Sequence, residues 1–321
     1  MKPIGYQLDL PNLSSPELYL PKPKPFLKWA GGKTQLLEQL AQFFPPSLAA
    51  GKITTYVEPF IGSGAVFFYL ASQFSIEKFV ISDINQELIL AYRTIQNSVE
   101  SLIFYLSELE QRYHALTDSE QEEFFYSTRS AFNLNRATTN YTLPNVERTA
   151  QIIFLNRTCY NGLFRVNAKG GFNVPFGSYK NPQICFPRIL RDCSAILQRT
   201  EIYHGDFSTC RPHVNQNTFV YFDPPYKPIS ATSSFKSYQV DDFDDLAQIR
   251  LANYYAELHS MGAKLMLSNS DPQNINHEDS FFQDLYPNFV IKKVQASRMI
   301  NSNGEKRGKI TELLIMNYES E

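Results

Sequence analysis

Five short apolar runs, each followed by a turn with Gly, Asp or Asn, most constrain the fold of this 321-residue chain. They lie at 55–60, 79–82, 201–204, 219–222 and 264–268. Short, continuous apolar runs are typical of parallel strands that are buried on both faces of a sheet. Helical stretches, for example 86–97 and 246–260, separate the runs, and this alternation predicts a doubly wound α/β sheet.

The last two strand-like segments differ from the first five. Residues 289–296 and 310–318 flank a loop at 297–309 and predict a hairpin, so we expect the sheet to end in an antiparallel strand. The whole sheet is therefore predicted to be Rossmann-like, seven-stranded and mostly parallel. A helix is also expected to open at Gly31 and to run to about Phe44, where two prolines end it.

The segment between the second and third predicted strands is too long for a simple crossover. A crossover helix needs only about a dozen residues, whereas this segment extends from 83 to 200. We predict an insertion at 98–187 that is helical at first and rich in Gly and Asn towards its end. The main domain would then occupy 25–97 and 188–321, preceded by a Pro-rich extension at 1–24.

Composition favours a cytoplasmic protein without a metal site. The formal net charge is −2, so nucleic-acid binding would depend on a local basic face rather than on a basic total. No apolar run approaches the roughly 18 residues of a membrane span, and the N-terminus lacks a signal-peptide core. The four cysteines show neither CxxC spacing nor His partners, which indicates reduced thiols rather than a zinc site.

A glycine-rich turn, Glu58-Pro59-Phe60-Ile61-Gly62-Ser63-Gly64, follows the first strand. Its glycines let the backbone approach a ligand closely beside the positive end of a helix. It lacks the third glycine of the dinucleotide fingerprint. Asp83 comes 19 residues after Gly64, where its carboxylate can accept both hydroxyl protons of a ribose, although capping the next helix is the alternative. The two features predict a nucleoside-containing cofactor of undetermined class.

Two other segments bear on the same cofactor. The segment from Lys28 to Thr34 is not a P-loop, because position 27 is Leu where that motif requires Gly. Its Trp29 and Lys33 suit a cationic, aromatic cofactor with a carboxylate, unless Trp29 only packs in the core. Asp206 follows the third strand and is placed to accept a bond from an adenine amine; an ordinary turn is the alternative.

The most specific motif is Asp223-Pro224-Pro225-Tyr226, directly after the apolar run 219–222. Two prolines stiffen the turn and remove two N–H donors. Asp223 and the Pro224 carbonyl would each accept an N–H of an exocyclic amine, which frees the nitrogen lone pair, while Tyr226 offers a face for stacking. The pattern predicts methylation of a planar amine by in-line attack on a sulfonium, without a metal or a strong base. A tight turn alone explains the prolines but not the acid and the aromatic beside them.

Two segments are candidates for contacts with a nucleic acid. Between 156 and 180, Arg, Asn and Lys alternate with aromatic residues and glycines, which suits base contacts in the major groove; a solvated loop is the alternative. The loop 292–309 is locally basic and includes Arg298, which suits phosphate contacts; an ordinary charged surface is the alternative.

Together these motifs resemble the Dam-type adenine-N6 DNA methyltransferases (D12 class, alpha group), and most closely the members that methylate GATC. The matching stretches are FLKWAGGK (26–33), EPFIGSGAVF (58–67), SDIN (82–85), YNGLFRVN (160–167), FNVPFGSYKNP (172–182), VYFDPPY (220–226) and SNSD (268–271). The resemblance extends from about 26 to 318. Ser178 departs from it, because family members often carry a basic residue at that position.

The resemblance implies a role for each matched position. Its catalytic motif matches Asp223, Pro224, Pro225 and Tyr226. Its cofactor positions match Trp29, Lys33, Asp83 and Asp223, with Asp206 expected to join them, and we add Glu58, Phe60, Gly62 and Gly64 from the glycine-rich turn. Its recognition positions match Lys28, Tyr160, Asn161, Leu163, Arg165 and Pro175, and we add Arg298.

The resemblance further implies S-adenosylmethionine as cofactor and N6 of adenine in double-stranded DNA as target, within GATC. The adenine must leave the duplex to reach Asp223, and Arg165 is expected to contact a guanine of the site. A cognate restriction endonuclease would share the target without binding this chain. Three alternatives stay open: an RNA adenine methyltransferase, a protein-glutamine methyltransferase and a non-catalytic DNA-binding protein. The Arg and Asn content of the insertion suits the major groove of DNA and argues against the RNA enzyme. Asp at position 223, where the glutamine methyltransferases carry Asn, argues against a protein substrate. The intact motifs at Asp83 and Asp223 argue against a non-catalytic protein.

Overall fold

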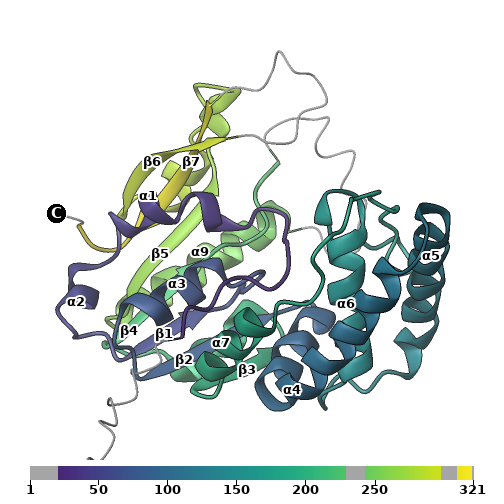
Figure 1. Cartoon of the computed structure of the whole chain (residues 1–321). Helices are drawn as coiled ribbons and strands as arrows, with labels where there is room; N and C mark the ends of the chain where they lie inside the picture. The colour runs from purple at the N-terminus through teal and green to yellow at the C-terminus, as the bar shows by residue number, and fades with distance from the viewer. Residues whose placement is uncertain (1–20, 229–242, 298–308, 320–321) are drawn as a thin grey trace, which may run out of the picture.

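The computed structural model describes residues 21–228, 243–297 and 309–319, and its core is a seven-stranded sheet (Figure 1). The strand order is β3-β2-β1-β4-β5-β7-β6. Neighbours among the first five strands pair in parallel, whereas β7 pairs antiparallel with both β5 and β6. The predicted seven-stranded, mostly parallel α/β sheet is therefore confirmed. The strands are β1 (Thr55–Glu58), β2 (Lys78–Asp83), β3 (Thr200–His204), β4 (Thr218–Phe222), β5 (Lys264–Ser270), β6 (Val290–Ser297) and β7 (Lys309–Met316).

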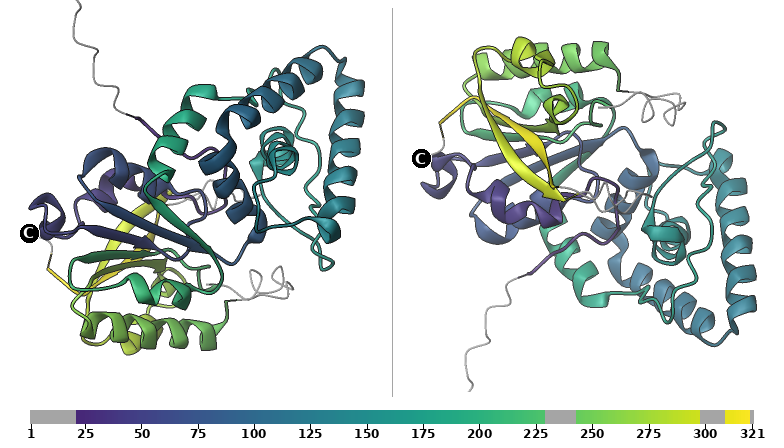
Figure 2. Two further views of the ribbon diagram at one scale, coloured as in Figure 1. Left: turned by 90° about the horizontal axis from the view of Figure 1, so that it is seen from below. Right: turned by 90° about the horizontal axis from the view of Figure 1, so that it is seen from above.

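Alternate residues of each central strand enter two separate cores, one on each face of the sheet. Tyr56 and Phe219 pack in the larger core with α3 (Ala65–Gln73), the start of α4 (Gln86–His114) and α7 (Pro187–Leu197). Val57 and Val220, one position further on, pack in the other core against α9 (Asp245–Ser260). The two views of Figure 2 show these helices on opposite faces. Burial on both faces explains why the central strands are continuous apolar runs.

Shorter elements complete the described chain. They are η4 (Phe207–His213), η5 (Pro272–Asn274) and α10 (Phe281–Leu285). The described residues contain no helix with the length and apolar character needed to cross a membrane. They also contain no cluster of three or more His, Cys, Asp or Glu side chains that could hold a metal ion. All four cysteines are buried and free.

The single helix expected from Gly31 to about Phe44 was wrong. The segment instead forms η1 (Lys33–Gln35) and α1 (Leu37–Ala41), joined at Leu36, and α2 (Pro46–Ala49) follows. Pro46 occupies the first turn of α2, where its fixed φ and missing N–H are tolerated, so the second proline begins a helix rather than only ending one.

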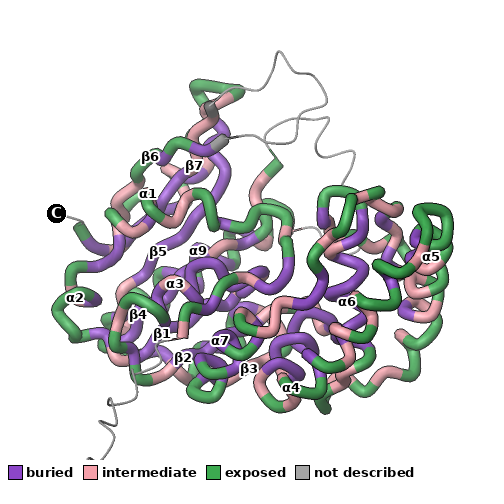
Figure 3. The backbone as a smooth tube through the Cα atoms, in the orientation of Figure 1, coloured by how far each residue is buried: buried purple, intermediate pink, exposed green. Residues whose placement is uncertain are grey.

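The region between β2 and β3 forms a helical body beside the sheet, on the right of Figure 1. It contains most of α4, then α5 (Asp118–Leu134), η2 (Asn135–Thr138), α6 (Val146–Thr158) and η3 (Tyr160–Gly162). Helix α4 breaks at Ser98, which has φ −144° and ψ 35°, and the predicted domain boundary between 97 and 98 lies at this break. In Figure 3, α6 is mostly buried and α5 carries the exposed outer face.

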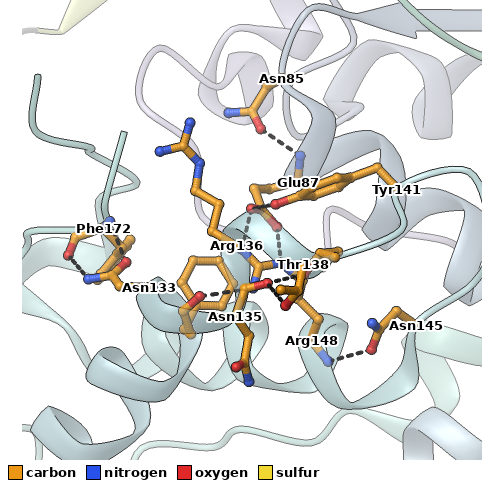
Figure 4. A network of polar contacts seen from close by, with 12 residues as sticks. Asn85, Glu87, Asn133, Asn135, Arg136, Thr138, Tyr141, Asn145, Arg148 and Phe172 are labelled. Carbon is orange, nitrogen blue, oxygen red and sulfur yellow. Dashed lines mark hydrogen bonds and ion pairs between the residues drawn. The ribbon is translucent and has the colours of Figure 1, made fainter. Parts of the chain in front are cut away.

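A buried ion pair joins this helical body to the sheet (Figure 4). Arg148 of α6 donates from Nε and Nη2 to the two carboxylate oxygens of Glu87 at the start of α4, over 2.8 and 2.5 Å. Tyr141 donates its hydroxyl to the same carboxylate over 2.5 Å. The exposed fractions are 3% for Arg148 and 9% for Glu87, so this pair lies in a low-dielectric environment that strengthens the attraction.

The same network continues into the segment predicted to recognise DNA. Arg148 also donates from Nη1 to the Phe132 carbonyl over 2.9 Å. The next residue, Asn133, donates to the carbonyl of Phe172 and accepts from its N–H (Figure 4). Arg136 donates to the Lys169 carbonyl over 2.5 Å. The position of the loop around 165–173 therefore depends on contacts that lead back to α4 and the sheet.

Replacing Arg148 with Met should lower the free energy of unfolding by about 3–5 kcal/mol, because the Glu87 carboxylate would stay buried without its cation. The matched control is Arg191→Gln, which breaks an Arg191–Glu100 pair with the same two-bond geometry at the surface. That variant should unfold at almost the wild-type urea concentration. Equal shifts of the two urea midpoints would show that burial does not determine how much the Glu87–Arg148 pair contributes to the free energy of unfolding.

Candidate active site

The carboxyl ends of three neighbouring parallel strands meet at one edge of the sheet and surround a cavity of about 680 Å³. β1 ends at Glu58, β2 ends at Asp83, and Asp223 directly follows β4. This edge is where open α/β sheets bind ligands. The predicted catalytic and cofactor residues that line the cavity are Trp29, Lys33, Glu58, Phe60, Gly62, Asp83, Asp206, Asp223, Pro224, Pro225 and Tyr226.

Gly64 is the one predicted cofactor residue that is not among those lining the cavity. It precedes α3 with φ +71°, a conformation that favours glycine. A Cβ at this position would lie 2.6 Å from the Tyr92 hydroxyl, so a larger residue would displace that side chain. Gly64 therefore shapes the turn that carries Gly62 to the cavity.

Asp83 is held by backbone donors at the edge of the cavity. Its carboxylate accepts the Gly62 N–H over 3.1 Å and the Asn85 N–H over 2.9 Å. Burial raises the pKa of Asp83, and these two bonds oppose the rise. The alternative that Asp83 caps the next helix was wrong, because Asn85 caps α4 by accepting from Glu87 and Leu88.

Lys33 supplies the positive charge beside the Asp-Pro-Pro-Tyr motif. Its ammonium lies 2.8 Å from a carboxylate oxygen of Asp223 and donates to the Gly31 carbonyl over 2.8 Å. It also lies 4.6 Å from the centre of the Tyr226 ring, within range of a cation–π contact. Burial raises the pKa of Asp223, and the Lys33 ammonium counteracts that rise. Lys33 thus favours the ionised form of a carboxylate whose pKa is raised by burial.

Glu58 is the most enclosed acid of the cavity, with 3% of its surface exposed. It accepts a hydrogen bond from the Tyr56 hydroxyl over 2.6 Å. Burial raises its pKa well above the usual range, and the Tyr56 bond opposes that rise. Glu58 and Asp223 also repel each other as anions, which further favours protonation of Glu58.

Asp206 lines the cavity but already has a cationic partner in this structure. Arg250 of α9 donates two bonds to its carboxylate, over 2.9 and 2.7 Å. This pair, together with a bond from Ser208, lowers the pKa of Asp206 to about 2 against the effect of burial. Sequence reasoning missed Arg250, because only the packing of α9 against the sheet brings residues 44 positions apart together.

Glu312 of β7 is a second cavity residue that sequence reasoning missed. It accepts a hydrogen bond from the Tyr226 hydroxyl over 2.7 Å. The signal in the sequence was an acid directly before the apolar run Leu313–Met316 of β7, and nothing local connects it to a motif 86 residues earlier. Phe243 also lines the cavity, where its ring packs edge-on against Phe60 with centroids 5.7 Å apart.

A second cavity, of about 1210 Å³, adjoins the first between the sheet edge and the helical body. Pro225 and Tyr226 line both cavities. From the helical body, Arg136, Arg165 and Lys169 line the larger cavity, and Asp244 and Asp245 line it at the start of α9. The three cations suit the part of the cleft next to the helical body to a polyanion.

Among the described recognition residues, Arg165 lines this cleft, whereas the other five do not. Arg165 is exposed, and Asn173 steadies its guanidinium by accepting from Nε over 2.8 Å. Tyr160 is 56% exposed and Asn161 has φ +57°, so both stand on a sharp turn at the surface. The remaining described members of the set are Lys28, Leu163 and Pro175. The Lys28 side chain packs on Gly162, where an added Cβ would lie 2.3 Å from it. Arg298 lies outside the described residues.

One aromatic contact connects the two parts of the site. Trp29 lines the smaller cavity and stacks on Phe164 of the insertion, with ring centroids 5.2 Å apart and an interplanar angle of 17°. The alternative that Trp29 serves only in the core is incomplete, because one side of this residue borders the cavity.

Comparison with known proteins defines the class of this site. Residues 29–300 match the family model described as D12 class N6 adenine-specific DNA methyltransferase. The chain belongs to this family, and it is therefore an enzyme that methylates adenine in DNA at N6. Family membership sets aside the RNA, protein-glutamine and non-catalytic alternatives.

Individual relatives agree with this assignment over nearly the whole chain. Type II methyltransferase M.MjaIII of Methanocaldococcus jannaschii is 51% identical over 296 residues, which cover 92% of this chain and 99% of that protein. Type II methyltransferase M1.LlaDCHI of Lactococcus lactis is 39% identical, with 92% and 95% covered. DNA adenine methylase of Escherichia coli is 32% identical, also with 92% and 95% covered.

Replacing Lys33 with Gln should move the acidic limb of the pH–rate profile to higher pH. The predicted role of Asp223 requires its ionised form, so activity is present above its pKa and is lost as the pH falls through that value. Without the Lys33 ammonium the pKa of Asp223 rises further. The measurement is the single-turnover rate against pH at saturating methyl donor. Lys78→Gln is the control, because Lys78 pairs with Glu201 rather than with a cavity residue. An unmoved limb in the Lys33 variant would contradict this account.

Proposed function

We propose that this enzyme transfers the methyl group of S-adenosylmethionine to N6 of an adenine that has been rotated out of double-stranded DNA, within GATC. The observation that carries the proposal is the position of Pro225 and Tyr226. Together with Ile84, Asn85 and Phe243 they line both a ligand-sized cavity and a larger cleft, and cationic residues of the helical body also line that cleft. A base that enters from the cleft would meet Asp223 where the cofactor site begins.

The smaller cavity suits S-adenosylmethionine in size and in chemistry. Its volume of about 680 Å³ lies within the usual range for small-ligand sites. Its aromatic and acidic lining suits a positively charged nucleoside, and the buried Asp83 carboxylate can accept from ribose hydroxyls. Trp29, Lys33 and the Glu58–Gly62 turn would complete the site. When bound, the cofactor supplies an activated methyl group on a sulfonium.

The reacting amine would be handled by this chain's own residues. Asp223 and the Pro224 carbonyl would accept hydrogen bonds from its two N–H groups, which draws electron density onto nitrogen and stabilises the positive charge that develops there. As the N–CH3 bond forms, the S–CH3 bond breaks, and the surplus proton on nitrogen would leave through the Asp223 carboxylate to solvent. Tyr226 stacks on the adenine ring and fixes its orientation. Lys33 keeps Asp223 ionised, as the 2.8 Å contact between them supports. Alignment is the main contribution, since the methyl group is already activated.

Sequence recognition would be the task of the insertion. Arg165 faces the cleft on a segment braced by Asn173, Asn133 and Arg136, so its guanidinium is presented from a firm support. Such a guanidinium can bind O6 and N7 of guanine with two bonds. GATC is proposed from the resemblance of residues 160–182 to the recognition segment of GATC-methylating members. Because M.MjaIII is named a type II methyltransferase, we also propose that a restriction endonuclease shares the target site.

Purified enzyme with radiolabelled S-adenosylmethionine should label duplex DNA that contains GATC, and mapping of modified bases should place N6-methyladenine at that site. Asp223→Ala should abolish transfer, because one of the two amine acceptors is lost. Cofactor binding by the variant can be followed through Trp29, the sole tryptophan, which borders the cofactor cavity. Turnover retained by Asp223→Ala would overturn the mechanism, and methylation at other sequences would overturn the assignment of GATC.

Arg165→Ala should relax discrimination at a single base pair of the target, with a cost of about 1–3 kcal/mol at that position. The measurement compares kcat/KM for the cognate duplex with that for each single-base substitution. Arg112→Ala removes an exposed cation of α4 that stacks on Phe124 and does not line the cleft, so it serves as the control. A uniform loss across all duplexes would make Arg165 a phosphate contact instead.

A further inference from the structure

Glu312 brings the antiparallel strand β7 into contact with the catalytic motif. Its backbone pairs with Ser270 of β5 on one side and with Val294 of β6 on the other. Its side chain borders the smaller cavity, where one carboxylate oxygen accepts the Tyr226 hydroxyl over 2.7 Å. No motif of the sequence includes Glu312, and the reaction outlined above does not use it.

Two contacts with described residues act on the Tyr226 ring. One is the hydroxyl bond, and another is the cation–π contact with Lys33, whose ammonium is 4.6 Å from the ring centre. The prolines before Tyr226 restrict the backbone but leave the side chain free to rotate. Lys33 also holds Asp223, so it is committed to a second partner. Glu312 instead contacts the hydroxyl of Tyr226 at the outer end of the ring.

The direction of this hydrogen bond is well defined. Burial raises the pKa of Tyr226 well above its usual value, and the nearby Asp223 and Glu312 carboxylates raise it further. The hydroxyl therefore stays protonated and donates, while Glu312 accepts. A bond from a neutral donor to a carboxylate is stronger than one between neutral groups, which suits it to holding a ring in place.

We propose that Glu312 is a positioning residue, which anchors the hydroxyl of Tyr226 so that its ring is presented at the angle on which the target adenine stacks. The proposal rests on the proposed function of Tyr226 as the stacking face. Glu312 itself touches neither the base nor the methyl donor. Its effect is on the rate of transfer from the assembled complex, because a ring that rotates freely spends less time in the reactive alignment.

A double-mutant cycle tests this through single-turnover rates at saturating DNA and S-adenosylmethionine. Glu312→Ala and Tyr226→Phe should each lower the rate about tenfold, because each removes one end of the same charge-assisted bond. The double variant should lose about tenfold as well, rather than the product of the two losses. Glu312→Gln keeps an acceptor for the hydroxyl and should stay within about threefold of wild type.

A second Tyr–Glu hydrogen bond on the sheet serves as a control, because it tests whether the loss of any such bond lowers the transfer rate. Tyr203 donates its hydroxyl to Glu201 over 2.5 Å on β3, and neither residue lines the cavities described above. Glu201→Ala and Tyr203→Phe should leave the transfer rate unchanged. Urea unfolding of every variant, and cofactor affinity from Trp29 fluorescence, separate a folding or cofactor defect from a defect in transfer.

Three outcomes would overturn the role of Glu312: a wild-type rate in Glu312→Ala, multiplicative losses in the double variant, or an equal loss in Glu312→Gln and Glu312→Ala with Tyr226→Phe unaffected. The last would mean that the charge acts directly and not through Tyr226. Failure of the proposed function is distinguishable, because the wild-type enzyme itself would then transfer no methyl group to the GATC duplex.

Discussion

Parallel strands that lie side by side must end at the same edge of the sheet, and the site depends on this constraint. It brings Glu58, Asp83 and Asp223 to one cavity although they are far apart in the chain. Burying carboxylates together in an apolar environment costs free energy unless each has a hydrogen-bond donor or a cation as partner. Each is compensated differently: Tyr56 donates to Glu58, backbone N–H groups donate to Asp83, and Lys33 pairs with Asp223. Three carboxyl groups of similar intrinsic acidity thereby acquire distinct environments.

In the proposed function, the reaction and the choice of target reside in different parts of the molecule. The four residues Asp223 to Tyr226 follow a central strand, whereas the candidate base contacts stand on a loop of the helical body. Several contacts hold these parts together, and two of them are side-chain pairs that face each other across the junction. The buried Glu87–Arg148 pair lies at the start of α4, and the stacked Trp29 and Phe164 rings lie beside the cavity. Rigid support is what a recognition loop needs, since specificity is lost when base contacts are loosely placed.

Much of this could be predicted from the sequence, because the central strands are buried on both faces and the motifs are local. The run 219–222 differs from β4 by one residue, and the tetrapeptide follows it directly. Prediction failed where remote elements decide the outcome. Arg250 meets Asp206 only after α9 packs, and Glu312 meets Tyr226 only through the pairing of β7. The helix expected to start at Gly31 failed for a local reason, because the extended backbone of Gly32 (ψ 132°) delays the first turn to Lys33, and Leu36 separates that turn from α1.

The contacts between the two parts also limit how the helical body could be exchanged. A chimera that exchanged residues 98–187 between relatives would carry Arg148 and Phe164 into the recipient but leave their partners, Glu87 and Trp29, behind. A graft would thus import a buried cation and an aromatic ring that both require matching residues in the host. The helical body is therefore attached to the sheet through specific side chains and not through its two chain connections alone, so an exchanged insertion would have to match its host at Glu87 and Trp29.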